Sequence, residues 1–431
     1  MEKIIGIRKE DKNIWEVRTP IIPEDVKELN IKFGIKSIVQ SFDRRSFSDN
    51  EYLKNGAEIN DDLTSCKAIF GVKEVPIQKI LPNKIYAFFA HVIKGQPYNM
   101  KMLKDLIDKK CTLIDYECIK DNTEKRLVFF GKFAGYAGMI DALYGLGRRI
   151  KALGRSNLFE RIQPAYKYHD VNEAMEEIKS VGADIEQLGL PKEFAPYVFG
   201  FTGYGNVSGG AQEIFELLPF EEITPEDLFD LNEAENKKLY KVIFREEHMV
   251  KPSHPENSFN LFDYFKHPEK YIMQFEKFVP FLSVIINAIY WDDRYPRLIT
   301  KGYLKKYANH KLLLISDISC DINGSIEITH KATMPDNPAY IYNPITDSFT
   351  DGFEGEGIVD MAVDNLPSEL PRDSSMAFSR ALMPFVDNIV SADLSKNFEE
   401  AGFYDEIKKA VIVYNGELTP NYEYLKTHLP K

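Results

Sequence analysis

Residues 85–117 read IYAFFAHVIKGQPYNMKMLKDLIDKKCTLIDYE, and this stretch decides the fold class. It holds two short apolar runs, at 85–90 and 112–116, on either side of a segment at 99–110 whose apolar residues recur at helical spacing. Short apolar runs bounded by turn-forming residues are typical of buried strands. A strand, a right-handed helical crossover and a second strand form a parallel pair whose strands end at the same edge. The stretch therefore predicts the parallel sheet of an α/β fold.

Ionisable residues stand where such apolar runs stop. The strand-end residues Lys73, His91 and Glu117 each follow one run, and Glu74 comes directly after Lys73. Ligands bind at the carboxyl edge of open α/β sheets. Histidine exchanges protons near neutral pH, and lysine does so once burial or a nearby cation lowers its pKa. We therefore predict that Lys73 and His91 act as an acid–base pair whose pKa values are set by Glu74 and Glu117.

An alternative places Lys73 in solvent at the end of a strand and His91 in the core as a hydrogen-bonded residue. For any one of the strand-end residues alone this alternative is favoured. Three ionisable residues at one sheet edge favour a functional site instead.

Two arginines are candidates for binding a carboxylate. Arg18 follows the first expected strand and so belongs to the same edge, and Arg126 precedes a segment rich in small residues at 129–149. The planar guanidinium binds a carboxylate through two hydrogen bonds, so two arginines suit a dicarboxylate. Taken singly, either arginine is more often solvent-facing.

A second motif at 197–211 reads YVFGFTGYGNVSGGA and joins a strand to a helix through a glycine-rich turn. Glycines allow the tight turn and the close approach of a pyrophosphate, and the helix N-terminus favours its charge. Gly203 and Gly205 occupy the first two positions of this dinucleotide fingerprint, Ser208 the third, and Gly210 follows. The alternative is a plain tight turn.

A candidate ribose-binding residue follows the glycine turn by about 20 residues, the spacing typical of dinucleotide-binding domains. Glu221 and Glu222 end an expected second strand there, and an acid at that position would bind the ribose 2′-hydroxyl of NAD. No arginine stands beside them in the sequence, which disfavours the 2′-phosphate of NADP.

The composition limits the partners. A chain of 431 residues with 44% hydrophobic and 28% charged residues suits a globular enzyme of about two domains. The net charge of −12 argues against nucleic-acid and anionic-membrane partners, because those require basic surface. The four cysteines show no metal-binding spacing, no apolar run approaches the ~20 residues of a membrane helix, and the start of the chain does not look like a signal peptide. We expect a cytoplasmic protein without a resident metal.

The chain is predicted to fold as two Rossmann-like domains with parallel sheets and an active-site cleft between them. Residues 1–140 plus 372–431 would form the substrate and catalytic domain, and 141–371 the dinucleotide-binding domain. The polar, proline-containing interval at 225–276 is expected to be irregular surface structure. The segment at 405–413 is expected to be helical.

Together these segments closely resemble the saccharopine dehydrogenase (lysine-forming) family, which is related in fold to alanine dehydrogenase. More specifically, they look like the lysine–2-oxoglutarate reductase half of the aminoadipic semialdehyde synthases. The resemblance covers nearly the whole chain in order. The matching stretches are 7–13, 15–16, 71–74, 86–91, 113–117, 202–208, 289–291, 296–298, 316–319, 324–327 and 363–367.

The resemblance implies reductive condensation of L-lysine with 2-oxoglutarate to saccharopine, with hydride from a nicotinamide cofactor. By position it gives Lys73 and His91 the acid–base roles, with Glu74 and Glu117 tuning them. The substrate positions that it implies are Arg18, Lys94, Gln96, Arg126 and Phe130. The cofactor positions that it implies are Gly203, Gly205, Ser208 and Gly210, with Ile318, Val363, Asp364, Asn365 and Leu366 near the nicotinamide ribose.

Reductases of this type generally use NADPH, whereas Glu222 by itself suggests NADH, so we expect NADP(H) with NAD(H) as the alternative. The resemblance also leaves open an NAD-dependent enzyme working in the lysine-forming direction, another amino-acid dehydrogenase of the same fold, and a non-catalytic sensor of saccharopine or nucleotide. Such reductases are usually followed by a second dehydrogenase. Its place here could be taken by a separate, glutamate-forming saccharopine dehydrogenase, and a homo-oligomer is compatible with all of these.

Overall fold

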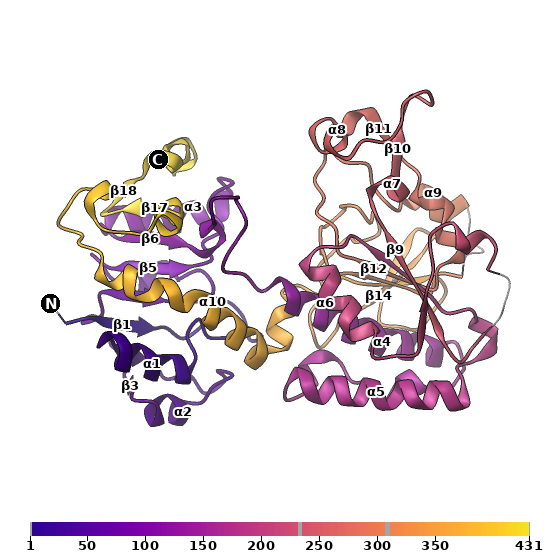
Figure 1. The fold of residues 1–431 in the computed structure, drawn as a ribbon, viewed down its shortest axis with the longest axis horizontal. Coiled ribbons are helices and arrows are strands. Elements are labelled where there is room, and N and C mark those ends of the chain that lie inside the picture. Colours follow the sequence, from indigo (N-terminus) through magenta and orange to yellow (C-terminus); the bar gives the residue numbers. More distant parts are fainter. Residues whose placement is uncertain (1, 232–234, 307–310, 431) are drawn as a thin grey trace. The chain divides into compact units, whose positions relative to one another are not determined.

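The computed structural model describes residues 2–231, 235–306 and 311–430. By their internal contacts these residues divide into two units, which are Met1–Phe130 with Pro371–Lys431, and Gly131–Leu370. Figure 1 shows the indigo N-terminal and yellow C-terminal segments interleaved in the first unit. The expected boundary at 140/141 falls inside helix α4 (Gly131–Ala152), which lies wholly in the second unit.

The first unit is built on an eight-stranded sheet of order β18-β17-β6-β5-β4-β1-β2-β3. Neighbouring strands are parallel except for the pairs β6–β17 and β17–β18 at one edge. Its strands are β1 (Ile4–Ile7), β2 (Lys36–Val39), β3 (Glu58–Ile59), β4 (Ala68–Phe70), β5 (Ile85–Phe88), β6 (Thr112–Asp115), β17 (Val411–Tyr414) and β18 (Glu417–Leu418).

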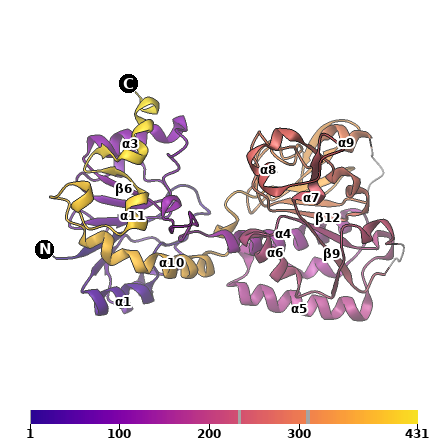
Figure 2. The same ribbon diagram turned by 45° about the horizontal axis from the view of Figure 1, so that its top comes forward.

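Helices connect and cover this sheet. They are α1 (Pro23–Phe33), α2 (Asp49–Lys54), α3 (Pro97–Asp108), α10 (Pro371–Ser391) and α11 (Asp405–Ala410). Prolines at the first helical position open α1 and α3, where a missing N–H costs nothing. Helices α1 and α10 lie side by side in both views (Figures 1 and 2).

The second unit repeats this plan with a sheet of order β15-β14-β16-β13-β12-β7-β9-β8. Neighbouring strands of this sheet are parallel except for the pairs β16–β14 and β14–β15 at one edge. Its strands are β7 (Val198–Thr202), β8 (Phe220–Glu222), β9 (Leu239–Phe244), β12 (Val284–Asn287), β13 (Leu314–Asp317), β14 (Tyr340–Asn343), β15 (Ser348–Asp351) and β16 (Ile358–Met361). The predicted α/β class with two mostly parallel sheets is confirmed.

Helix α4 and helix α6 (Asn206–Phe215) pack closely in the second unit (Figure 1). A Cβ added to Gly135 would collide with backbone atoms of Val207 and Ala211, and one on Gly210 with the backbone of Lys132. The small residues of α4 therefore allow another backbone to approach it. The other helices are α5 (Val171–Leu188), α7 (Glu246–Met249), α8 (Leu261–Lys266) and α9 (Lys301–Lys306).

Two local predictions were wrong. The interval at 225–276, expected to be irregular, contains β9, which pairs with β7 inside the sheet, and a hairpin of β10 (Val250–Pro252) and β11 (Tyr271–Met273). The strand β9 was missed because it contains Lys241, and a lysine is unusual in a buried strand. Its ammonium forms ion pairs with Glu216 and Glu222. The segment at 405–413 is helical only to Ala410, after which the β-branched run at 411–413 forms β17.

Within the described part of the chain, no helix combines the length and the apolar character needed to cross a membrane. The cytoplasmic location and the cleft between the domains stay predictions.

Candidate active site and dinucleotide loop

The strand-end residues follow three neighbouring strands of the first unit. Strands β4, β5 and β6 pair in parallel, so Lys73, His91 and Glu117 follow the same edge of the sheet. His91 has a left-handed backbone with φ of 49°, which is uncommon for a residue other than glycine and turns the chain sharply after β5. The predicted placement of these residues at one edge is confirmed.

His91 and Glu74 contact each other directly. His91 Nδ1 lies 2.8 Å from Glu74 Oε1, and the imidazole is 33% exposed. This contact orients the ring and leaves Nε2 as the nitrogen that can exchange a proton with a ligand. Asn99 Nδ2 also donates to Glu74 Oε1 at 3.2 Å and to the carbonyl oxygen of Ala90 at 2.8 Å. The start of α3 thus holds the carboxylate beside His91.

Glu74 remains ionised although it is largely buried. Burial raises its pKa, but the hydrogen bond with His91, a backbone N–H and the charge of Lys12 together hold the pKa well below its usual range. Lys12 Nζ lies 3.1 Å from Glu74 Oε2. The charged carboxylate therefore faces Nδ1 of His91 and fixes the orientation of the ring.

A buried carboxylate that the sequence analysis missed holds the Lys73 backbone. Glu10 Oε1 accepts the Val72 N–H at 2.7 Å and Oε2 accepts the Lys73 N–H at 3.0 Å. Arg8 Nη1 donates to Glu10 Oε2 at 3.3 Å. Burial raises the pKa of Glu10 to about 7. Glu10 therefore fixes the backbone from which the Lys73 side chain extends.

A second buried acid, Asp115, fixes the backbone that follows β5 and β6. Its carboxylate accepts the Ala90 N–H at 3.3 Å and the Glu117 N–H at 2.9 Å. Burial raises the pKa of Asp115 to about 7. An acid inside an otherwise apolar strand was the sequence signal that could have identified it.

Both candidate arginines are paired with carboxylates of the chain. Arg18, only 2% exposed, donates through Nε to Glu16 Oε1 at 2.8 Å and through Nη2 to Glu16 Oε2 at 2.5 Å. Its guanidinium lies 4.1 Å from the centre of the Phe130 ring. Arg126 forms an ion pair with Glu117. The structure thus pairs Glu117 with an arginine rather than with His91.

Aromatic rings pack beside these charged groups. Phe89 stacks on His91 with ring centres 6.3 Å apart, and Phe130 stacks on Phe378 at 4.4 Å. Phe378 comes from α10, more than two hundred residues away in sequence, and was not predicted. Of the two remaining substrate candidates, Lys94 is exposed, while Gln96 Oε1 is buried and accepts no hydrogen bond within the described ranges.

The glycine-rich turn lies at the carboxyl end of β7 in the second unit. Gly203 has φ of 84°, and its N–H donates to the Phe244 carbonyl at 3.2 Å. Gly205 is the N-cap of α6, and a Cβ there would meet open space. The open space beside Gly205, at the N-terminus of α6, fits the close approach of a pyrophosphate. Ser208 is buried and its Oγ accepts a hydrogen bond from Gln212 at 3.0 Å.

The acidic strand end is not beside this turn. Strand β8 does end at Glu222, but β9 lies between β8 and β7. Glu222 forms an ion pair with Lys241 at 2.9 Å. The residues that follow β9 are Arg245 and Glu246, and neither was singled out from the sequence.

Tyr204 connects the glycine turn to the end of β9. Its hydroxyl donates to Glu246 Oε2 at 3.1 Å, and the Arg245 guanidinium lies 4.9 Å from the ring centre. A cavity of about 330 Å³ opens here, lined by Gly203, Gly205 and aromatic side chains including Tyr264 and Tyr290. The end of β9, not of β8, therefore borders the glycine turn.

The other cofactor candidates follow neighbouring strands of the same sheet. Ile318 comes directly after β13 and packs over Gly138 of α4. The turn at 363–366 follows β16, and the Asp364 N–H donates to the Thr333 carbonyl at 3.1 Å. Within the described ranges no group of three or more His, Cys, Asp or Glu side chains is placed to hold a metal ion.

The sequence matches two domains of one family. The alanine dehydrogenase/PNT N-terminal domain matches residues 6–137 and the C-terminal domain matches residues 227–421. The chain belongs to the alanine dehydrogenase/PNT family. A solved L-alanine dehydrogenase shares the family fold, with a TM-score of 0.59 and 16% identity over 99% of this chain and 100% of that one.

Curated relatives are similar over nearly the whole chain. The alpha-aminoadipic semialdehyde synthase of Arabidopsis thaliana is 40% identical over 98% of this chain, and the chain spans 41% of that protein's length. A saccharopine dehydrogenase [NAD(+), L-lysine-forming] of Emericella nidulans is 24% identical over 92% of this chain and 95% of its own length. The chain is therefore an enzyme-family member whose relatives include lysine and saccharopine enzymes.

Proposed function

We propose that the chain catalyses the reductive condensation of L-lysine with 2-oxoglutarate to saccharopine, in the direction of lysine degradation. The observation that carries the proposal is the hydrogen bond between His91 and the ionised Glu74. His91 and Lys73 follow neighbouring parallel strands and so stand at the same edge of the sheet. Similarity to alpha-aminoadipic semialdehyde synthase over nearly the whole chain supports the choice of substrates.

The chemistry requires several proton transfers. The ε-amine of lysine adds to the keto carbon, the resulting carbinolamine loses water to give an imine, and reduction of that imine gives the secondary amine of saccharopine. A reduced nicotinamide supplies the hydride when it is bound. Lys73 and His91 exchange protons with the carbinolamine oxygen and the imine nitrogen. Glu74 and Glu117 set the charge around them.

The substrate candidates offer matching groups. Arg18 and Arg126 would bind the carboxylates of 2-oxoglutarate, Arg126 by leaving Glu117. The Phe130 ring lies 4.1 Å from the Arg18 guanidinium and would stabilise its charge. Gln96 would turn its buried Oε1 to the substrate amine, and the exposed Lys94 would approach a carboxylate.

For the cofactor we propose NADP(H) over NAD(H). Gly203, Gly205, Ser208 and Gly210 form the turn and helix that would receive the pyrophosphate, with Ile318 and the turn at 363–366 near the nicotinamide ribose. We replace Glu222 in the ribose site by Arg245 and Glu246. The exposed guanidinium of Arg245 suits a 2′-phosphate, and Glu246 would accept from a 2′-hydroxyl.

The test follows the absorbance of reduced nicotinamide with lysine and 2-oxoglutarate, in separate NADH and NADPH assays. The proposal predicts consumption that requires both substrates. Consumption with pyruvate and ammonia instead would identify an alanine dehydrogenase. No consumption with either cofactor, together with saccharopine binding by calorimetry, would favour the sensor.

A second candidate is the lysine-forming direction with NAD, which the Emericella nidulans relative favours because it matches over nearly its full length. It predicts faster oxidation of saccharopine with NAD than with NADP, and lysine as a product. In either direction, no metal, nucleic acid or membrane takes part. If saccharopine is the product, a separate glutamate-forming saccharopine dehydrogenase would consume it.

A further inference from the structure

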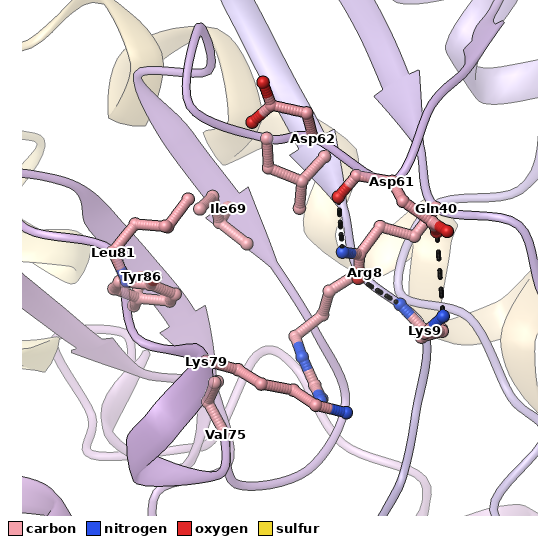
Figure 3. Close-up of a pocket in the computed structure, with 11 residues that line it drawn as sticks. Arg8, Lys9, Gln40, Asp61, Asp62, Ile69, Val75, Lys79, Leu81 and Tyr86 are labelled. Carbon is pink, nitrogen blue, oxygen red and sulfur yellow. Dashed lines mark hydrogen bonds and ion pairs between the residues drawn. The ribbon is translucent and has the colours of Figure 1, made fainter.

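The segment that follows β1 holds the loop that carries Lys73. Glu10 accepts the Lys73 N–H at 3.0 Å and a hydrogen bond from Arg8 at 3.3 Å. Asp11 forms ion pairs with both Arg8 and Lys79. Figure 3 shows the Arg8 and Lys79 side chains reaching toward each other in the wall of a cavity of about 330 Å³. Ion pairs and backbone contacts therefore fix the loop that follows β4.

The loop that follows β5 is held in a different way. It leads from His91 to Gln96 and carries two substrate candidates, Lys94 and Gln96. Gly95 has φ of 66°, and its N–H donates to the Val92 carbonyl at 2.9 Å, which closes a tight turn. Glycine loses more conformational freedom on folding than any other residue. Contacts from outside the loop therefore decide how well this turn is ordered.

Such contacts come from the C-terminal segment of the same unit, which forms the 3₁₀ helix η12 (Pro420–His428). The Tyr424 hydroxyl donates to the Ile93 carbonyl at 2.6 Å. The His428 imidazole lies against Gly95, because a Cβ added to Gly95 would be 2.6 Å from its Nδ1 and 2.9 Å from its Cδ2. Two residues from far along the chain thus contact the loop from opposite ends of one turn.

The helix η12 is itself anchored in the core of the first unit. Leu425 is fully buried there. Tyr422 is 9% exposed and donates to the Lys409 carbonyl at 2.6 Å. Its hydroxyl is also within hydrogen-bonding reach of Cys118, in the turn that follows β6. The loop that follows β5 is therefore fastened to a base that is fixed in the core and beside β6.

We propose that Tyr424 and His428 are positioning residues, which hold the loop at 92–96 in the conformation that binds substrate. The inference rests on the proposed function, because it takes Lys94 and Gln96 as substrate-binding residues. Neither positioning side chain has to contact a substrate. Loss of either contact lowers the fraction of chains whose loop is ready to bind, and this weakens the apparent affinity.

The first measurement is amide hydrogen exchange of the whole chain without substrates. Tyr424→Phe removes only the hydroxyl and should speed exchange of the Gly95 amide by roughly three- to tenfold, the factor that one hydrogen bond supplies. His428→Ala loses a packing contact and should speed it by about twofold or more. Exchange in β4 and β5 should stay unchanged. Tyr404→Phe and His254→Ala, at exposed side chains, are the matched controls and should leave Gly95 exchange unchanged.

The second measurement is steady-state kinetics with lysine and 2-oxoglutarate. Tyr424→Phe combined with His428→Ala should raise the KM for lysine by roughly tenfold and change kcat by less than about twofold, because the loop binds substrate and transition state alike. His428→Asn keeps a planar polar group near Gly95 and should stay closer to the unmodified KM than His428→Ala. A general loss of folded chain would instead lower kcat and leave KM unchanged.

Unchanged exchange of Gly95 in both single variants would overturn the proposal, whatever their activity. Faster exchange throughout the first unit would overturn it too, because η12 would then stabilise the whole unit rather than this loop. So would a lower kcat at an unchanged KM. If the unmodified chain consumes no reduced nicotinamide, the proposed function fails, while faster exchange confined to the loop still supports its positioning by η12.

Discussion

The two units share one sheet plan but place charge differently at the carboxyl ends of their strands. In the first unit the chain leaves β4, β5 and β6 into Lys73, His91 and Glu117. In the second unit it leaves β7 into Gly203 and Gly205, next to a cavity whose lining includes four tyrosines. One edge carries a lysine, a histidine and a glutamate, and the other carries a glycine-rich turn beside aromatic side chains.

Buried acids differ between the units as well. Glu10 and Asp115 in the first unit each accept two backbone N–H groups, so each acid fixes a loop of the site. In the second unit Asp141 of α4 and Glu369 are close enough to hydrogen bond to each other, and each keeps one buried oxygen that no described donor reaches. A proton held between the two carboxyl groups satisfies both oxygens.

The largest expected effect concerns the charged edge. Lys73→Met combined with His91→Gln should lower turnover by at least ~100-fold, the scale of acid–base groups, with little change in the unfolding midpoint. The measurement is steady-state consumption of reduced nicotinamide, together with thermal unfolding. The matched control is Lys101→Met with His169→Gln, both exposed. Near-normal turnover in the first double variant would remove the acid–base assignment.

The second-largest effect concerns the proton shared by Asp141 and Glu369 in the second unit. Burial, which is the main cause, raises the pKa of Asp141 to about 6, and burial with the charge of Asp141 raises that of Glu369 well above its usual range. The folded state therefore binds a proton that the unfolded chain releases near pH 4, so stability falls as pH rises from about 4 through 6 and beyond.

Glu369→Gln should remove much of this loss, because the amide donates to Asp141 without a titrating proton. We expect the variant to be more stable than the unmodified chain at pH 8, on the order of 1–3 kcal/mol, and no more stable near pH 4. Urea unfolding at several pH values measures the difference. Glu176→Gln, on the exposed face of α5, is the control. A parallel shift at every pH would contradict the shared proton.

Substitutions of two glycines in the dinucleotide turn should affect different properties, one the stability of the chain and the other dinucleotide binding. Gly210→Ala should destabilise the chain by about 1–3 kcal/mol, because its Cβ meets the Lys132 backbone of α4. Gly205→Ala should leave stability nearly unchanged, because its Cβ meets open space, but should weaken dinucleotide binding. Thermal unfolding and calorimetry with NADPH measure the two effects. Equal destabilisation by both variants would contradict this division.

The sequence predicted strands such as β5, β6 and β7 because short apolar runs bounded by turns stand out against polar loops. It failed at β9, where Lys241 interrupts the run and its partners Glu216 and Glu222 come from other elements. It also placed Glu222 beside the glycine turn, whereas β9 lies between β7 and β8. The spacing along the sequence could not show this, because the order of strands in a sheet depends on tertiary pairing. Arg245 and Glu246 became candidates only once β9 was known to pair with β7.

Strand ends were predictable in the same way, so the sequence placed Lys73, His91 and Glu117 after neighbouring strands of one sheet. The partners of these residues were not, because an isolated acid such as Glu10 looks like a surface residue until its backbone donors are known. Phe378 packs on Phe130 from a helix far along the chain, and no local pattern signals such a contact. The ion pairs of Arg18 and Arg126 could not be predicted either, because they depend on the folded chain.

The smallest expected effect compares the two strand ends directly. Arg245→Ser at the end of β9 should lower the ratio of kcat/KM for NADPH to that for NADH by roughly tenfold, because one charged contact to a 2′-phosphate is lost. Glu222→Gln at the end of β8 should change this ratio by less than about twofold, since Glu222 already pairs with Lys241 and lies beyond β9. Steady-state kinetics with both cofactors measure the ratio. If Glu222→Gln changes the ratio more than Arg245→Ser does, the ribose site lies at the end of β8 instead. The residue that contacts the ribose must be the one whose charge controls the choice between the cofactors.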